Sequence, residues 1–111
     1  MLSKSKRLNL SKNFKWVTQG KKVECSSFKI FYRAGENNFP LVGIALRKAY
    51  FHDANKRNQA KRIVSSEIEK HYENLPSSLN LVIMPKELIL KTTKEDLKKE
   101  IESVISRFSS N

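Results

Sequence analysis

Hydrophobic and polar residues alternate with period two between residues 28 and 33, which predicts a β-strand with two different faces. One face is apolar and is expected to join the core: Phe28, Ile30 and Tyr32. The other face is basic with an aromatic side chain in its middle: Lys29, Phe31 and Arg33. Residues 34–40 contain Gly35 and two asparagines, and this composition is typical of a turn.

Two further segments are apolar without regular polar alternation. Residues 41–46 (LVGIAL) predict a strand buried on both faces, and this strand runs directly into Arg47 and Lys48. Residues 79–84 (LNLVIM) predict another apolar strand. Pro85 is expected to end it, because proline cannot donate a hydrogen bond to a neighbouring strand.

Helix signals flank these strands. A short helix within residues 11–20 can be capped by Ser11 at its start and ended by Gly20 in a left-handed conformation. A long helix is expected to follow Asp53, a good N-cap, and to run to about Glu73. Its core-facing residues recur near helical spacing: Ile63, Ile68, Tyr72 and Leu75.

A last helix is expected after Thr92 and Thr93, where Glu95 and Asp96 supply capping-box chemistry. Its apolar stripe consists of Leu97, Ile101, Val104, Ile105 and Phe108. The element order is then α-β-β-β-α-β-α, which predicts an α+β fold built as a single-sheet α/β sandwich. We expect one domain over residues 1–111, with residues 1–10 as a basic arm whose clustered charge favours partial disorder.

The charge of the chain indicates that this small sandwich is a binding protein. The chain has 22 Lys and Arg against 11 Asp and Glu, a net charge of +11. The excess lies in residues 1–33, with nine basic and one acidic side chain, and in residues 47–62, with six and one. Such regional positive charge is expected of a protein that binds nucleic acid or another anionic surface.

Other classes are less compatible with the composition. Cys25 is the only cysteine, so an intrachain disulfide and a cysteine-based metal site are excluded. No run approaches the roughly 20 apolar residues of a membrane span, and we expect a cytoplasmic protein without a membrane partner. DNA binding is disfavoured because no helix-turn-helix spacing is present.

The long helix opens with a basic stretch, in which Asn58 and Gln59 are interleaved with cations: Lys56, Arg57, Lys61 and Arg62. Residues four apart lie in one row on a helix, so these like charges repel and mildly destabilise it unless an anion binds. The neutral amides suit phosphate, sugar or base edges. From charge alone, a solvated basic face and an RNA-binding face are equally compatible.

The basic strand face offers a second candidate site. An aromatic side chain flanked by cations, as Phe31 is by Lys29 and Arg33, can stack on a base and neutralise the adjoining phosphates. The competing interpretation, which we favour slightly for its main role, is that Phe31 packs beneath the first helix against Phe14. Both can hold at the edge of a helix–sheet contact. Trp16 and the pair Tyr50-Phe51 are further aromatics, better explained as core or crevice lining.

The sequence does not indicate a catalytic centre made of protein side chains. His52 precedes Asp53, but a nuclease centre needs clustered carboxylates for Mg²⁺ or histidines placed across a cleft. His71 is about five helical turns from His52. Glu67, Glu69 and Glu73 are expected to form a solvated face that balances Lys70. We expect no catalytic residue and no metal ligand in the polypeptide.

Several segments together resemble bacterial ribonuclease P protein subunits over roughly residues 6–108. The segment KRNQAKRIV (56–64) resembles the family's Arg-Asn-Arg-x-x-Lys-Arg helix signature, with Gln59 in place of the second arginine. RLNLSKNF (7–14) is similar to the family's opening segment, and VGIALRK (42–48) to its Val-Gly strand and basic end. LVIM (81–84) and the last amphipathic helix fall where the family has them, although Thr18 replaces a usual aromatic.

The resemblance implies a protein that assists an RNA enzyme in removing the 5′ leader of precursor tRNA. Contacts to the catalytic ribonuclease P RNA are implied for Arg47, Lys48, Lys56, Arg57, Asn58, Lys61 and Arg62. A cleft for the leader is implied at Phe14, Lys29, Phe31 and Arg33. The RNA is expected to carry out hydrolysis with Mg²⁺, and the protein to be a monomer within the ribonucleoprotein, with a left-handed βαβ crossover in its fold.

Two other functions stay open at this point. A generic RNA-binding protein, such as a ribosomal-protein-like module or an RNA chaperone, would share the charge but would not prefer substrates with unpaired 5′ nucleotides. A stand-alone nuclease would cut RNA by itself when Mg²⁺ is present.

Overall fold

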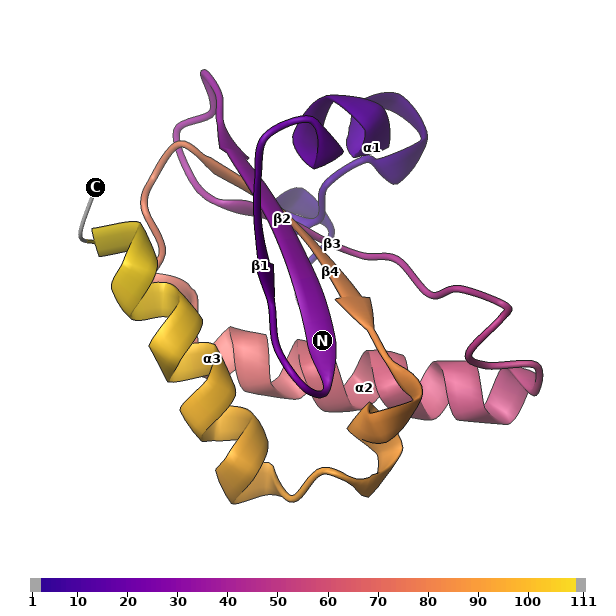
Figure 1. Ribbon diagram of the computed structural model, residues 1–111. Helices are drawn as coiled ribbons and strands as arrows, with labels where there is room; N and C mark the ends of the chain where they lie inside the picture. The colour runs from indigo at the N-terminus through magenta and orange to yellow at the C-terminus, as the bar shows by residue number, and fades with distance from the viewer. Residues whose placement is uncertain (1–2, 110–111) are drawn as a thin grey trace.

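The computed structural model describes residues 3–109 and has one four-stranded sheet between helices (Figure 1). The helices are α1 (Leu10–Thr18), α2 (Ala54–His71) and α3 (Lys94–Ser109), and the strands are β1 (Lys21–Glu24), β2 (Phe28–Ala34), β3 (Leu41–Ile44) and β4 (Leu79–Pro85). Three short 3₁₀ helices complete the order: η1 (Lys4–Lys6), η2 (Tyr72–Asn74) and η3 (Glu87–Lys91). The predicted order α-β-β-β-α-β-α is confirmed.

The strands lie side by side in the order β1-β2-β4-β3. β1 pairs with β2, and β2 with β4, in antiparallel fashion, whereas β3 and β4 are parallel neighbours. A parallel pair needs a long crossover, and here α2 supplies it. The left-handedness of that crossover stays a prediction of the family resemblance.

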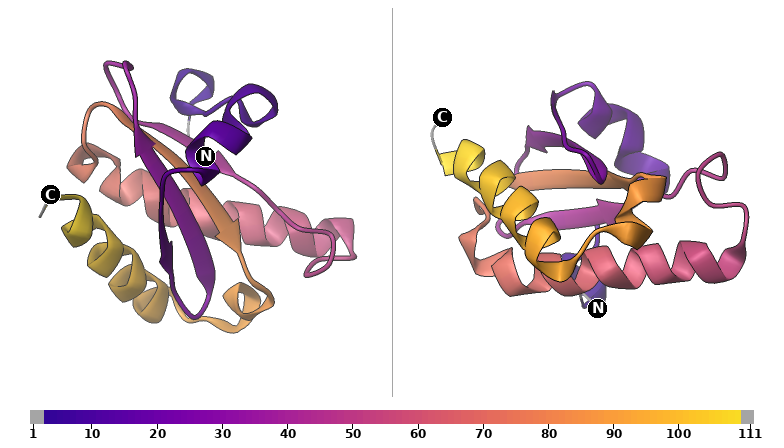
Figure 2. Two further views of the ribbon diagram at one scale, coloured as in Figure 1. Left: turned by 45° about the horizontal axis from the view of Figure 1, so that its top comes forward. Right: turned by 60° about the horizontal axis from the view of Figure 1, so that its bottom comes forward.

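The two faces of the sheet are covered by different helices, as the right-hand view of Figure 2 shows. α2 and α3 cover one face and enclose the main core, where Phe28 and Ile30 of β2 are each 1% exposed. α1 covers part of the other face with a smaller cluster around Leu8, Val17 and Val82. The period-two pattern of residues 28–33 is therefore confirmed, since its alternate residues face these two layers.

The start of α1 differs from the prediction. Asn9, not Ser11, is the N-cap: its side chain accepts a hydrogen bond from the Lys12 N–H at 3.3 Å, and Ser11 Oγ donates to the same Asn9 oxygen at 2.7 Å. The end of α1 also differs, because no described glycine has a positive φ and Gly20 is therefore not left-handed. A Cβ at Gly20 would lie 2.5 Å from the Tyr32 carbonyl oxygen, so a close backbone approach explains the glycine.

The two later helices begin where the sequence predicts. The Asp53 side chain accepts from the Asn55 N–H at 2.8 Å, and Thr93 Oγ1 accepts from the Asp96 N–H at 3.1 Å. α2 ends two residues before Glu73, and the chain continues as η2. The expected apolar stripe of α3 faces the main core, with four members buried and Ile105 partly buried.

Glu67 corrects the prediction of a solvated acidic face on α2. Glu67 is only 4% exposed, and one of its carboxylate oxygens lies 3.0 Å from Nε2 of His71, one turn later in the helix. The ammonium of Lys70 lies 3.9 Å from the other oxygen. A buried carboxylate is tolerated when it is paired in this way.

The N-terminal segment closes the outer edge of the sheet. β3 ends at Ile44, two residues earlier than predicted. On its outer side, Arg7 forms an isolated parallel bridge with Val42, and the Leu8 N–H donates to the Val42 carbonyl at 2.9 Å. Leu8 is 6% exposed. The arm predicted over residues 1–10 is therefore partly built into the domain, and its residues 1–2 lie outside the described residues. This bridge pairs part of an otherwise open sheet edge.

Candidate nucleic-acid interface

The basic face of α2 is the first candidate surface. Asn58, Lys61 and Arg62 are exposed, and the two cations follow Asn58 by three and four residues, so they lie on the same side of the helix as Asn58. Lys61 also lines a hollow of about 190 Å³ between α2 and β3, together with Arg7 from the N-terminal segment. The docking of that segment therefore brings a cation of the predicted arm next to the basic helix.

Two other predicted residues of α2 lie elsewhere. Lys56 is exposed but lines a different hollow, of about 370 Å³, with Glu87 and Lys91 of the η3 region. Arg57 is half-buried, and its Nη1 donates to the backbone carbonyls of Phe51 at 2.8 Å and His52 at 3.3 Å. Arg57 thus holds the loop before α2 in place, and only the remainder of its guanidinium group can serve a ligand.

The loop between β3 and α2 carries the other two predicted cations. Arg47 and Lys48 are exposed, in a turn beyond the end of β3 and not on the strand itself. The guanidinium carbon of Arg47 lies 5.5 Å from the centre of the Tyr50 ring. Phe51 is 1% exposed and anchors the loop in the main core, which settles the pair Tyr50-Phe51 as mainly structural. In Figure 1 this loop extends away from the sheet before it enters α2.

The α1 side of the sheet is the second candidate surface. Phe31 of β2 and Phe14 of α1 both pack against the smaller cluster, as the structural interpretation predicted, yet both stay partly exposed. Lys29 Nζ lies 5.8 Å from the centre of the Phe31 ring. Packing and exposure therefore coexist here, so that an aromatic ring and a cation are presented together.

Arg33 has a structural role on this side. Its guanidinium carbon lies 4.5 Å from the centre of the Trp16 ring, and its Nη1 donates to the Trp16 carbonyl at 3.1 Å. These contacts fix the end of α1 on the sheet. Trp16 itself is 36% exposed and lines a hollow of about 750 Å³ together with Gly35 and Asn80, which agrees with the crevice lining that its sequence context suggested.

One cation of this surface was missed by the sequence analysis. Lys22 of β1 is the register partner of Phe31, so both side chains lie on the α1 side of the sheet. Lys22 is exposed and lies 3.9 Å from Glu24 on the same strand. The segment KKVE contains the signal, because Lys22 and Glu24 alternate with the buried Val23.

The His, Cys, Asp and Glu side chains of the described residues are more dispersed than the Lys and Arg side chains. Among residues 3–109, no group of three or more His, Cys, Asp or Glu side chains could hold a metal ion. Asp53 serves as a helix cap, and His71 is paired with Glu67. The hydrogen bond from Lys86, followed by its charge, keeps the pKa of the Glu24 carboxyl below its ordinary value. No helix within the described part of the chain is long and apolar enough to cross a membrane.

Comparison with known proteins gives consistent matches. The sequence model of the family described as Ribonuclease P matches residues 2–109. The ribonuclease P protein component of Blochmanniella floridana is 31% identical over 104 residues, which are 93% of this chain and 87% of that protein.

Two solved structures share the fold. The RNase P protein from Thermotoga maritima is similar with a TM-score of 0.80 at 20% identity, covering 91% of this chain and 96% of that one. The RNase P protein from Staphylococcus aureus is similar with a TM-score of 0.78 at 18% identity, covering 93% of this chain and 94% of that one. Both likenesses concern the backbone arrangement of the α+β sandwich.

Proposed function

The chain belongs to the ribonuclease P protein family, as its helix signature predicted, and we propose that it uses two separate surfaces within the ribonucleoprotein. The basic face of α2 binds the catalytic RNA. The α1 side of the sheet binds the unpaired 5′ leader of precursor tRNA. In this proposal the RNA subunit carries out hydrolysis with Mg²⁺, and the protein neutralises backbone charge and positions the substrate.

The observation that carries this proposal is the separation of two cationic surfaces by the sheet. α2 lies on one face, and Phe31, Phe14 and Lys29 lie on the other. A single basic protein that only coats RNA does not need an aromatic ring among the cations on a second face. One surface can therefore hold the enzyme's own RNA while the other stays accessible to substrate.

The α2 face suits a structured RNA. Lys61 and Arg62 are exposed cations on a rigid helix, and Asn58 beside them offers an amide donor and acceptor. Cations position RNA through phosphates, and amides can contact sugars or base edges. Binding through phosphates releases counterions, so assembly is expected to weaken steeply as salt rises.

The α1 side suits a single strand. The exposed part of the Phe31 ring can stack on a base, and Lys29 and Lys22 stand beside it for the phosphates. Stacking of one base on an aromatic side chain contributes about 1–3 kcal/mol and tolerates any base. This tolerance suits a single strand whose sequence is not read base by base.

The test is to measure leader dependence with the reconstituted ribonucleoprotein. The protein is combined with a bacterial ribonuclease P RNA at low Mg²⁺, and its affinity is measured for precursor tRNA with and without the 5′ extension. Tighter binding of the leader-bearing form only when protein is present supports the proposal. Equal affinity for both forms would leave a generic RNA-binding protein as the better description.

Variants then separate the two surfaces. Lys61→Ala is expected to weaken assembly with the RNA subunit and to lower the slope of log affinity against log salt by about one. Phe31→Ala is expected to leave assembly nearly intact and to erode the preference for leader-bearing substrate. Lys98→Ala, an exposed lysine on α3, is the matched control for charge. Equal damage by the first two variants to the same step would refute the two-surface arrangement.

A further inference from the structure

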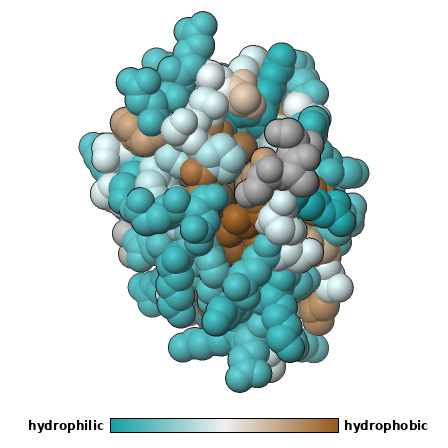
Figure 3. Space-filling model, turned by 90° about the vertical axis from the view of Figure 1, so that its left-hand side faces the viewer, coloured by the Kyte–Doolittle hydropathy of each residue, from teal (hydrophilic) through white to brown (hydrophobic). Residues whose placement is uncertain are grey.

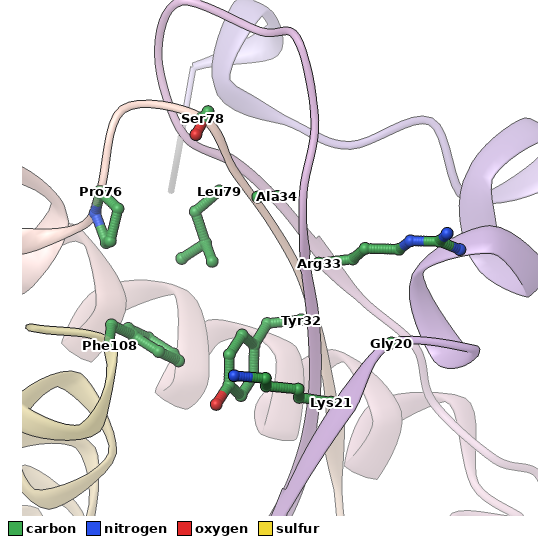
Figure 4. Close-up of a pocket in the computed structure, with 9 residues that line it drawn as sticks. All are labelled: Gly20, Lys21, Tyr32, Arg33, Ala34, Pro76, Ser78, Leu79 and Phe108. Carbon is green, nitrogen blue, oxygen red and sulfur yellow. The ribbon is translucent and has the colours of Figure 1, made fainter. Parts of the chain in front are cut away.

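A pocket of about 310 Å³ lies behind the proposed leader surface, on the side of the sheet that α2 and α3 cover. It opens between β2 and the last turn of α3 (Figure 4). Its apolar lining comes from three distant parts of the chain and consists of Tyr32, Pro76 with Leu79, and Phe108. Figure 3 shows an apolar hollow on this side of the molecule, with hydrophilic residues along much of its border. A hollow with an apolar lining and few polar groups is the usual form of a ligand site.

The shape of the lining favours a flat ring. The rings of Tyr32 and Phe108 meet edge to face, with their centres 4.7 Å apart and an angle of 65° between their planes. Phe108 and Leu79 are 7% and 5% exposed, so they form the fixed inner part, whereas Tyr32 is partly exposed at the opening. A planar ring entering here would contact aromatic and aliphatic carbon and displace water from both.

The polar groups at the opening favour an anionic substituent on that ring. Lys21 lies beside the Tyr32 ring at the mouth in Figure 4, and it is exposed. Within residues 3–109 its ammonium has no hydrogen bond or ion pair, and neither the Ser78 hydroxyl nor the Tyr32 hydroxyl has a hydrogen-bond partner. A nucleotide combines the required features, since its base is planar and its phosphate is negative.

The sheet register connects this pocket with the leader surface. Lys22 pairs with Phe31 on the α1 side, and the preceding residue Lys21 pairs with Tyr32 on the pocket side. Consecutive residues of a strand point to opposite faces, and β1 is the edge strand at this end of the sheet formed by the described residues. A single strand that leaves Phe31 can therefore pass around the β1 edge along Lys22 and Lys21.

We propose that this pocket binds the base of one further unpaired nucleotide of the 5′ leader, with its phosphate against Lys21. The inference rests on the proposed function, because it takes the leader to lie on the α1 side of the sheet. An aromatic side chain of a partner protein would fill the lining equally well but would leave Lys21 without an anion. The positive charge of residues 1–33, to which Lys21 and Lys22 belong, favours the RNA.

The experiment compares precursor tRNAs whose leaders increase one nucleotide at a time, bound to the reconstituted ribonucleoprotein. Lys21→Ala removes the phosphate contact, and Ser78→Trp fills the pocket from its half-exposed rim. Both variants are expected to match the unmodified protein on mature tRNA and on short leaders. On longer leaders, both variants are expected to bind roughly fivefold or more weakly than the unmodified protein. This factor is the lower end of the contribution of one stacked base.

The controls keep this inference separate from the proposed function. Phe31→Ala should lose affinity from the first leader nucleotides onward, and Lys98→Ala should follow the unmodified protein at every length. If the unmodified protein shows no leader preference, the proposed function fails. If leader preference is present but Lys21→Ala and Lys98→Ala coincide at all lengths, the pocket inference alone is refuted.

A direct probe covers the case in which Ser78→Trp folds poorly. In the free protein, a short oligouridylate is expected to shift the NMR signals of the Tyr32 and Phe108 rings, and Lys21→Ala should weaken this effect. Uridine 5′-monophosphate in a parallel titration distinguishes a free nucleotide from an RNA strand. Ring shifts with the monophosphate but not with the oligonucleotide would overturn the assignment to the leader.

Discussion

Replacing Gly20 tests how the corner between α1 and β1 is built. The sequence suggests that this glycine is needed for a left-handed backbone, whereas the structure gives it no positive φ. A Cβ at this position would lie 2.5 Å from the Tyr32 carbonyl oxygen and 2.9 Å from Arg33 Cβ. Both atoms belong to the framework of β2 and cannot rotate aside, so Gly20→Ala is expected to destabilise through crowding.

Crowding of a packed site costs about 1–3 kcal/mol. For a domain of this size, each kcal/mol lowers the melting temperature by about 4 °C, so Gly20→Ala is expected to lower it by about 4–12 °C. Gly43→Ala is the matched control, because its Cβ would meet the end of the Leu10 side chain, which can rotate away. Both replacements restrict the unfolded chain alike, so the difference between them isolates the contact with β2.

Gly20→Asn distinguishes the two explanations, since asparagine tolerates left-handed backbone better than alanine but is larger. Equilibrium unfolding in urea, followed by circular dichroism, gives the free energy of unfolding of all three variants. The contact argument expects Gly20→Asn to be at least as damaging as Gly20→Ala, and both to exceed Gly43→Ala. A Gly20→Asn variant that is clearly milder than Gly20→Ala would refute the reasoning.

Two further predictions concern charged groups that hold the sheet to its surroundings. Glu100 accepts hydrogen bonds from the Ser27 hydroxyl at 2.6 Å and from the Ser27 N–H at 3.3 Å. Glu100→Ala is therefore expected to lower the free energy of unfolding by about 2 kcal/mol, measured by unfolding in urea. Glu102 is exposed on the same helix, and Glu102→Ala should change the free energy of unfolding by less than about 0.5 kcal/mol in the same experiment. The pKa of Glu24 is lowered by Lys86, so the carboxylate stabilises the fold above its ordinary pKa of 4.5 and loses this contribution as pH falls through the lowered value. Glu24→Gln should therefore reduce the loss of stability on the acid side, and an unchanged acid titration would contradict the pairing.

Local signals predicted the elements whose formation depends on neighbours in sequence. The apolar stripe of α3 and the capping residues Asp53 and Thr93 are defined within one or two helical turns, and each is found where expected. The same holds for β2, because alternation along one strand decides which side chains face each layer. Such patterns need no knowledge of what the element packs against.

Local signals in the sequence do not determine at which residue α1 begins. Asn9 and Ser11 are both good capping residues, and nothing nearby in the sequence chooses between them. The choice depends on Leu8, which is buried against the sheet through its hydrogen bond to Val42, 34 positions later. Once Leu8 is fixed on the β3 edge, the chain must turn at Asn9, and α1 begins there.

The burial of Glu67 was, in contrast, within reach of the sequence. Glu67 and His71 are four residues apart on a helix, a spacing at which the side chains can meet. A hydrogen-bonded pair of this kind lowers the cost of burying the carboxylate, and the helical positions of Ile63 and Ile68 place Glu67 beside the core. Treating every glutamate of the basic helix as solvated overlooked this pairing.

The sequence indicates the chemical character of the two candidate surfaces but not how their residues are arranged. Charge and aromatic patterns indicate which residues suit RNA, because these chemical properties belong to the side chains themselves. Whether two such residues act together depends on the fold: Arg57 turns to the carbonyls of its own loop, and Lys56 lies apart from Lys61 although both are on α2. The pocket behind β2 is the extreme case, since Tyr32 and Phe108 are brought together only after β2 and α3 have packed. The proposed second nucleotide site therefore has no signal in the sequence beyond Lys21 and Lys22, whose consecutive positions on an edge strand send one cation to each side of the sheet.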